Sequence, residues 1–491
     1  MTAATAPNGQ VKNPWPALWA MVIGFFMILV DSTIVSVATP DIQRELGTTY
    51  NAVIWVTSAY LLAYAVPLLI TGRLGDKVGP KLIYLVGLAL FTASSLWCGL
   101  TGTIEGLIAA RIVQGFGASM MTPQTMAVIT RTFPPDRRGK AMALWGATAG
   151  VATLVGPVLG GLLVQFAGWE WIFFINVPVG IIGFVLAVKL VPRLTTHPHT
   201  FDWLGVALSA TAMFLLVFGI QEGETYDWGT ITGVISVPLL IVAGLLVFVL
   251  FFWWQRVNQN EPLLPLEIFA NSSFSISSLA IACVSFAMTS MAFPFMLWAQ
   301  IVRDMSPVEA GLLFVPMAIM SVIMAPIVGR FTDTASPRLL ATIGFAVAGA
   351  VLIFLHLAID LDTPIWVLWV GLGGFGFGNA FLWAPLAATA TRKLPVQLAG
   401  AGSGVYNSVR QVGAVLGSAA IAAAISARLA HHLPGFDSEG AGSAPIGSLP
   451  PQIAQQFSDA MADTLWVPTI AFVVGLIIVQ FYGRSPARAS K

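Results

Sequence analysis

The sequence predicts an all-α membrane protein made of two related six-helix halves and two additional central helices. Three observations lead to this fold class: an apolar composition, a series of long apolar segments, and an internal repeat. Hydrophobic residues make up 57% of the 491 residues and charged residues only 9%, whereas a soluble domain carries roughly 25% charged residues. A soluble fold has no means of burying so much apolar surface, so most of the chain must face lipid.

Apolar segments follow one another along almost the whole chain, separated by polar or Pro/Gly-rich breaks. A transmembrane helix needs about 20 such residues. The segments predict fourteen spans, at 15–38, 51–71, 80–100, 103–126, 139–166, 169–191, 201–221, 231–254, 274–300, 307–329, 338–358, 363–390, 399–428 and 464–482. The first segment is too long for a typical cleaved signal, so we expect an uncleaved span.

The positions of Lys and Arg agree with this count and orient the chain. With the N-terminus in the cytoplasm, only Arg44, Arg303 and Arg428 of the 23 basic residues fall in outer segments. Only Arg111 and Arg410 fall deep within spans, away from the span ends. A miscounted span would reverse the asymmetry from that point onward. We therefore expect a multi-pass protein of the plasma membrane with both termini in the cytoplasm.

Short motifs recur in the two halves of the chain. GRLGDKVGPK at 72–81 is matched by GRFTDTASPR at 329–338, GFG at 115–117 by GFG at 376–378, and RTFPPDRRG at 131–139 by RKLPVQLAG at 392–400. The offset is 257 residues for the first pair and 261 for the other two. Parallel repeats of this kind build many secondary transporters. We expect a cytoplasmic N-terminus at 1–14, an N-terminal half at 15–191, a linker with two additional spans at 192–273, a C-terminal half at 274–482 and a tail at 483–491.

Ionisable side chains at membrane depth are costly and usually functional, so they are the first candidates for a site. Asp31 lies in the first span and Arg111 in the fourth. Arg111 keeps its proton and is the best candidate partner for Asp31. A carboxylate whose protonation competes with a cationic substrate is a minimal device for proton antiport. The alternatives are an Asp31 that packs helices or faces a wet vestibule, and an Arg111 that forms a structural ion pair.

Two glycine-containing segments are candidates for conformational elements. A latch between helices is predicted at the first inner loop and after the next one, at Gly72, Arg73, Asp76, Gly79, Lys81 and Arg138. A carboxylate there can accept hydrogen bonds from a helix N-terminus or pair with a basic residue. The fifth span combines small residues that allow close packing with a proline that permits a bend: Gly150, Gly156, Pro157, Gly160 and Gly161. An ordinary inner turn and ordinary glycine-rich packing are the alternatives.

Polar and aromatic side chains deep in the spans are candidates for the lining of a substrate cavity, with ordinary packing as the alternative. They are Gln114, Asn379, Trp383, Tyr406, Asn407 and Arg410.

Other functional classes have weaker support in the sequence. An ATP-driven pump is disfavoured because no G-x-x-x-x-G-K-[ST] motif occurs. His356 and Asp360 share one helical face, which leaves a membrane enzyme as an alternative. Cys98 and Cys283 lie in apolar segments and the two adjacent histidines at 431–432 have no ligand spacing, so we expect no metal and no cofactor.

These motifs resemble those of the major facilitator superfamily, in its branch of fourteen-spanning drug:proton antiporters. GRLGDKVGPK resembles the loop signature of the superfamily, and RIVQGFGASMMTP resembles its helix-4 signature. GATAGVATLVGPVLGGLL, which contains Gly156 and Pro157, resembles the helix-5 signature associated with antiporters. DSTIVSVATP and NSVRQVG are typical of the branch.

The resemblance implies export of hydrophobic or amphipathic small molecules in exchange for protons. It places Asp31 and Arg111 in proton coupling and Asp76 in a loop latch, with Arg137 or Arg138 as its partner. Family members that prefer dicationic drugs carry a deep carboxylate in the C-terminal half, and this chain has none there. Neutral or monocationic substrates therefore fit better.

The expected partners are the substrate, protons and membrane lipids. Nucleic acid is not expected, because the net charge is only +1. We expect a monomer. A lipid or glycolipid exporter or flippase of the same fold is the alternative function.

Overall fold

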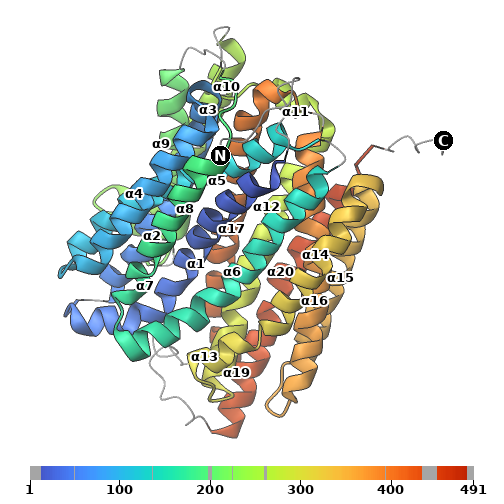
Figure 1. The fold of residues 1–491 in the computed structure, drawn as a ribbon. Coiled ribbons are helices and arrows are strands. Elements are labelled where there is room, and N and C mark those ends of the chain that lie inside the picture. Colours follow the sequence, from blue (N-terminus) through green and yellow to red (C-terminus); the bar gives the residue numbers. More distant parts are fainter. Residues whose placement is uncertain are drawn as a thin grey trace.

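The computed structural model describes residues 13–48, 50–134, 137–196, 202–223, 225–258, 262–392, 394–433 and 450–483. These residues form a single bundle of long, roughly parallel helices (Figure 1). The described part of the N-terminal half contains α1 (Trp15–Glu45), α2 (Tyr50–Ala65), α3 (Leu68–Val78), α4 (Pro80–Leu100), α5 (Ile104–Thr132), α6 (Arg138–Ala167), α7 (Trp171–Phe174) and α8 (Asn176–Leu190).

The middle of the chain forms a pair of helices joined by a short hairpin. These elements are α9 (Trp203–Gln221), β1 (Thr230–Thr232), the antiparallel β2 (Ile235–Ser236) and α10 (Val237–Val257). The C-terminal half contains α11 (Glu267–Ala270), α12 (Ser272–Ile301), α13 (Pro307–Leu312), α14 (Val315–Thr334), α15 (Pro337–Ala358), α16 (Ile365–Arg392), η1 (Val396–Leu398), α17 (Ala399–His432), α19 (Pro451–Thr464) and α20 (Trp466–Val479).

Eleven helical segments among the described residues are long and apolar enough to cross a membrane. The number is twelve when α2 and α3, bent by 45° at their junction, count as one span. The chain is therefore a multi-pass membrane protein. The count of fourteen stays a prediction. Helices α5 and α6, of 29 and 30 residues, lie at the other two predicted spans, and buried polar side chains such as Arg111 and Gln124 lower the hydropathy of α5.

The internal repeat is visible in how the helices pack. Gly117 of α5 lies against the backbone of α4, so that a Cβ atom there would lie 2.7 Å from the nitrogen of Phe91. Its counterpart Gly378 of α16 lies against α15 in the same way, 2.9 Å from the nitrogen of Ala348. Only glycine allows such close approach of two helical backbones. The GFG motifs thus fix one helix pair in each half.

Asp202 ties the additional helices α9 and α10 together. Its carboxylate accepts hydrogen bonds from Gly205 N at 2.8 Å, Trp254 Nε1 at 2.9 Å and Gln255 Nε2 at 2.8 Å. It also accepts one from Leu263 N at 3.3 Å, which leads toward the C-terminal half. Burial alone would raise the pKa of Asp202, but these hydrogen bonds outweigh it and hold the pKa below its ordinary value. The helix pair is thus fixed to the chain that follows it.

The glycine seams lead to a stability prediction. Gly117→Ala and Gly378→Ala each place a methyl group against a backbone and should destabilise the fold by about 1–3 kcal/mol. The measurement is the thermal unfolding midpoint of the purified protein in detergent. Gly102→Ala is the matched control, because nothing lies within 4 Å of a Cβ atom at that position. Equal midpoints for all three variants would contradict the packing interpretation.

Candidate functional site

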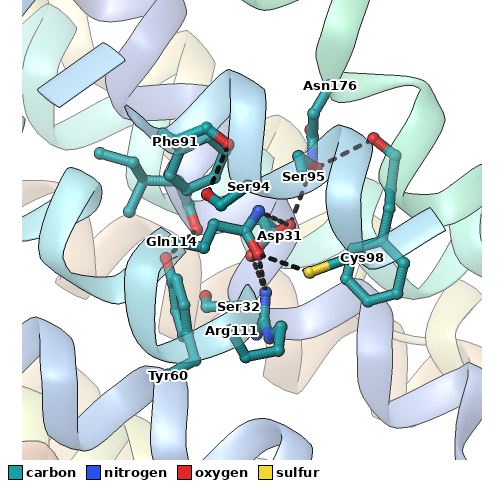
Figure 2. A network of polar contacts seen from close by, with 12 residues as sticks. Asp31, Ser32, Tyr60, Phe91, Ser94, Ser95, Cys98, Arg111, Gln114 and Asn176 are labelled. Atoms are coloured by element: carbon teal, nitrogen blue, oxygen red, sulfur yellow. Dashed lines mark hydrogen bonds and ion pairs between the residues drawn. The ribbon is translucent and has the colours of Figure 1, made fainter. Parts of the chain in front are cut away.

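A network of polar side chains surrounds Asp31 at the centre of the N-terminal half (Figure 2). Asp31 is completely buried in α1. Its Oδ2 atom pairs with Arg111 NH1 of α5 at 2.5 Å. Its Oδ1 atom accepts hydrogen bonds from Gln114 Nε2 and from Asn176 Nδ2, both at 2.9 Å. The carboxylate is therefore engaged by one cation and two amides, and the pairing of Asp31 with Arg111 is confirmed.

Arg111 is held from several sides at once. Its Nε atom donates to the carbonyl of Val56 at 3.1 Å, and NH1 also donates to Gln114 Oε1 at 2.7 Å. The ring of Tyr60 lies under the guanidinium, 4.0 Å from its central carbon. Its Nη2 atom is buried and has no hydrogen-bond partner among the described residues. These contacts come from α2 and α5, so the orientation of Arg111 depends on how those helices pack.

The second side of the network reaches α4 and α8. Asn176, at the start of α8, donates to both Asp31 and Ser95 Oγ, the latter at 3.1 Å. Ser95 Oγ in turn donates to the carbonyl of Phe173 at 3.0 Å. Through these contacts the Asp31–Arg111 ion pair joins α1 to α2, α4, α5 and α8 in a buried centre. A wet vestibule around Asp31, one of the sequence-based alternatives, is wrong for this conformation.

Helix α6 packs on α1 beside this centre through its glycine face. A Cβ atom at Gly156 would lie 3.2 Å from the carbonyl oxygen of Val30, the residue before Asp31. One at Gly160 would lie 2.8 Å from the side chain of Ile34. Gly161 faces Val308 in the other half of the chain. The surroundings of Gly150 and Pro157 lie outside what the structure describes.

Asp76 of α3 reaches across the interface between the halves. Its carboxylate accepts hydrogen bonds from Gly400 N at 3.0 Å and Ala401 N at 2.9 Å, in the first turn of α17. The first N–H groups of a helix have no partner within the helix and carry a partial positive charge, so a carboxylate there is favourable. Gly72 and Gly400 make this possible, because a Cβ atom at Gly72 would lie 2.6 Å from the Gly400 carbonyl oxygen. We call this contact the first latch.

The repeat builds a second latch of the same kind. Asp333 of α14, the counterpart of Asp76, accepts a hydrogen bond from Gly139 N in the first turn of α6, at 2.8 Å. Gly139 is itself the counterpart of Gly400. A Cβ atom at Gly139 would lie 2.9 Å from the carbonyl oxygen of Gly329. Each half therefore caps a helix of the other half, and both latches lie at the end of the bundle where α3 and α14 end.

The prediction that Asp76 pairs with Arg137 or Arg138 is wrong. Within the described ranges, Asp76 forms no ion pair with Arg137 or Arg138. Arg138 instead donates from Nε to the carbonyl of Phe133 at 3.0 Å. The carboxylate of Asp76 already has strong donors in the free N–H groups at the start of α17. The residue types in the sequence do not indicate that these N–H groups lie nearby. The other predicted latch residues have different surroundings. Gly79 adopts a φ of 105° at the turn before α4, and Lys81 donates a hydrogen bond to the carbonyl of Val188. Arg73 is buried in α3.

The predicted cavity residues do not line one cavity. Gln114 belongs to the Asp31 network. Asn379 accepts a hydrogen bond from Trp383 Nε1 at 3.0 Å, and both face Gly146 of α6 around a space of only about 10 Å³. That space holds at most about one water molecule. Tyr406 is buried and its hydroxyl has no partner among the described residues.

Arg410 of α17 lies at a separate contact between the halves. Its NH2 atom donates to Tyr64 OH of α2 at 3.1 Å, and its Nε atom donates to Asn407 Oδ1 at 3.3 Å. Tyr64 OH also lies 3.0 Å from Thr122 Oγ1 of α5. Asn407 and Arg410 are therefore a second pair of predicted cavity residues that the structure brings together, besides Asn379 and Trp383.

Sequence reasoning missed several members of these sites. Asn176, Ser95 and Tyr64 are neutral polar residues of types common in spans, and nothing in their local sequence singles them out. Asp333 could have been found, because the repeat aligns it with Asp76. The proposed acid–base pair of His356 and Asp360 has a packing explanation: His356 Nδ1 lies 2.9 Å from the carbonyl of Ala462.

Two related helical halves that cap each other's helices, with a buried ion pair inside one of them, are the architecture of a secondary membrane transporter. The chain belongs to the Major Facilitator Superfamily, whose family model matches residues 21–418. It is 47% identical to an uncharacterized MFS-type transporter of Mycobacterium tuberculosis, over 98% of this chain and 84% of that protein. It is 33% identical to the tetracenomycin C resistance and export protein of Streptomyces glaucescens, over 88% and 80%. Among solved structures, the proton:xylose symporter XylE has a TM-score of 0.63 at 13% identity, over 95% of each chain.

The buried ion pair leads to a double-mutant prediction. Asp31→Asn and Arg111→Gln should each destabilise the fold by about 3–5 kcal/mol, because each leaves one buried charge without its partner. The double variant should lose clearly less than the sum of the two. The measurement is the unfolding free energy in detergent. The exposed pair Asp41 and Arg44 is the control, where each loss should stay below about 1 kcal/mol. Additive losses at the buried pair would contradict the prediction.

The first latch leads to a conformational prediction. Asp76→Ala removes both hydrogen bonds to α17 and should separate the halves at the latch end. Spin labels on cysteines introduced at Val78 and Gln397, which are exposed on opposite sides of the latch, would report this as a larger long-distance population in pulsed electron paramagnetic resonance. Asp41→Ala, at the far end of α1, is the matched control. An unchanged distance distribution in Asp76→Ala would rule out a latch.

Proposed function

We propose that the protein is a proton-coupled antiporter that exports hydrophobic or amphipathic small molecules by alternating access. The observation that carries this proposal is the ion pair between Asp31 and Arg111, which is fully buried and held by further hydrogen bonds. In the membrane interior, a titratable group of this kind is expensive and is the expected place for a proton.

Protonation of Asp31 gives a physical route to coupling. Arg111 stays charged at any physiological pH. A proton on Asp31 would therefore leave a buried guanidinium without its counter-charge, which is strongly unfavourable. The amides of Gln114 and Asn176, which donate to the carboxylate, would also lose part of their acceptor. Relief requires that α1 move relative to α5 and α8, so that one proton changes the helix packing of the N-terminal half.

The two latches support the alternating-access part of the proposal. Both lie at one end of the bundle, and each joins a carboxylate of one half to a helix N-terminus of the other. With the positive-inside rule, the basic loop at 72–81 places this end in the cytoplasm. The conformation is then closed toward the cytoplasm. Opening to the cytoplasm requires Asp76 and Asp333 to release their partners.

The relatives support the direction and the substrates. The Streptomyces glaucescens relative is named a resistance and export protein, and further relatives at 32% identity are named multidrug resistance proteins. Export from the cell places the protein in the plasma membrane, with both termini in the cytoplasm as the sequence predicts. Among the described residues, the middle of the C-terminal half holds no carboxylate, which supports neutral or singly charged substrates over dications.

The proposal predicts the transport phenotype of Asp31→Asn. Cells that express the protein would be preloaded with the neutral probe N-phenyl-1-naphthylamine, and its efflux would be followed by fluorescence with and without a protonophore. The wild-type protein should export the probe only while the proton gradient persists. Asp31→Asn should lower the gradient-dependent rate at least about tenfold, because the single titratable group of the pair is removed.

The control is Asp360→Asn, which removes an exposed carboxylate outside the network and should export at the wild-type rate. Gradient-dependent efflux that survives in Asp31→Asn at equal expression would contradict proton coupling through this residue. Wild-type efflux that continues with the gradient collapsed would favour the facilitated movement of lipids or lipid-like molecules instead.

A further inference from the structure

The second charge at membrane depth, Arg410, has no acidic partner. It is buried in α17, with 7% of its surface exposed. Its partners are the phenol of Tyr64 and the amide of Asn407, which are neutral. In the part of the chain that the structure describes, no carboxylate lies within ion-pair distance of it. The guanidinium is therefore hydrogen-bonded but not neutralised.

The contrast with Arg111 shows that this arrangement is unusual for the molecule. Arg111 is matched by Asp31, and Asp31 is already engaged by three donors, so it offers no free charge to a ligand. Among the described residues at membrane depth, the charge left without a counter-charge is therefore that of Arg410. A buried cation without a counter-charge is strongly unfavourable, and an anion from outside the protein would remove that penalty.

We infer that Arg410 is the counter-charge for an anionic group, such as a carboxylate or sulfonate, on the transported amphipathic molecule. The inference rests on the proposed export function and specifies its substrate class. A planar guanidinium matches carboxylate and sulfonate oxygens with two parallel hydrogen bonds. Tyr64 and Asn407 occupy two of its donor directions now and are neutral groups that an anion can replace. A monocationic substrate, which the sequence favours, is repelled at this position.

The position of Arg410 also connects such a site to the proton-binding pair. Tyr64 stacks on Tyr60 with ring centroids 6.1 Å apart, and Tyr60 carries the guanidinium of Arg111 on its face. Tyr64 is the penultimate residue of α2, just before the 45° bend to α3 and the first latch. An anion that takes Arg410 away from Tyr64 therefore acts on a side chain that contacts both the Asp31 centre and the hinge of the second span.

The test uses two probes that differ by one charged group. These are the anionic 8-anilinonaphthalene-1-sulfonate and the neutral N-phenyl-1-naphthylamine, which share the same aromatic skeleton. Binding to the purified full-length protein in lipid nanodiscs is titrated by fluorescence, with empty nanodiscs subtracted. The wild-type protein should bind the anionic probe more tightly than the neutral one. Arg410→Gln should weaken the anionic probe by about tenfold or more, since a charge-assisted contact is lost, and leave the neutral probe within about twofold.

Arg410→Lys keeps the charge and should retain most of the preference for the anionic probe. Equal affinity of the wild-type protein for the two probes would overturn the inference without any variant. An equal loss of both probes in a folded Arg410→Gln protein would also overturn it, because Arg410 would then be a packing residue. Binding is measured without a proton gradient, so its outcome is independent of proton coupling. The neutral-probe efflux assay reports separately whether the proposed export function holds.

Discussion

The structure depends first on the mutual neutralisation of Asp31 and Arg111 in the buried centre of the N-terminal half. Asp31 and Arg111 are both completely buried, and neither charge is tolerable there alone. The pair satisfies this constraint only because α5 places Gln114 next to Arg111 and α8 brings Asn176 to the other carboxylate oxygen. Helices that are otherwise held by weak apolar contacts are thereby fixed relative to one another. The carboxylate of Asp31 thus adds to the glycine seams a constraint that relates several helices of the N-terminal half at once.

The interface between the halves is governed by a different constraint, the unpaired N–H groups at helix starts. The internal repeat gives each half one aspartate and one glycine at matching positions, and the structure pairs them across the halves, Asp76 with Gly400 and Asp333 with Gly139. The glycines let the backbones approach closely enough for each carboxylate to reach the start of the facing helix. Symmetry in sequence thus becomes a symmetric closure of one end of the bundle.

The sequence predicted the architecture more completely than it predicted the contacts of the candidate site. Apolar segments, basic loops and the repeat are long-range regularities, so the helical halves could be predicted. The pairing of Asp31 with Arg111 could be predicted too, because few charges lie at membrane depth. The backbone partners of Asp76 could not be predicted, because every residue except proline has a backbone N–H group. Only the packing of the helices decides which of these groups lies within reach of the carboxylate. The sequence assigns Asn379 and Arg410 to the same cavity because both are polar residues within spans. In the structure they contact different neighbours, Trp383 and Tyr64 respectively.

The molecule therefore treats its two deep arginines in opposite ways. Arg111 is compensated within one half, where its charge fixes the packing of five helices. Arg410 lies between the halves, and its hydrogen-bond partners among the described residues are the neutral oxygens of Tyr64 and Asn407. In this conformation the compensated charge of Arg111 holds helices together, whereas the uncompensated charge of Arg410 makes the conformation sensitive to an anion that reaches it. The stacked Tyr60 and Tyr64 place these two charges in one continuous set of contacts, so an event at either one acts on side chains that the other also requires.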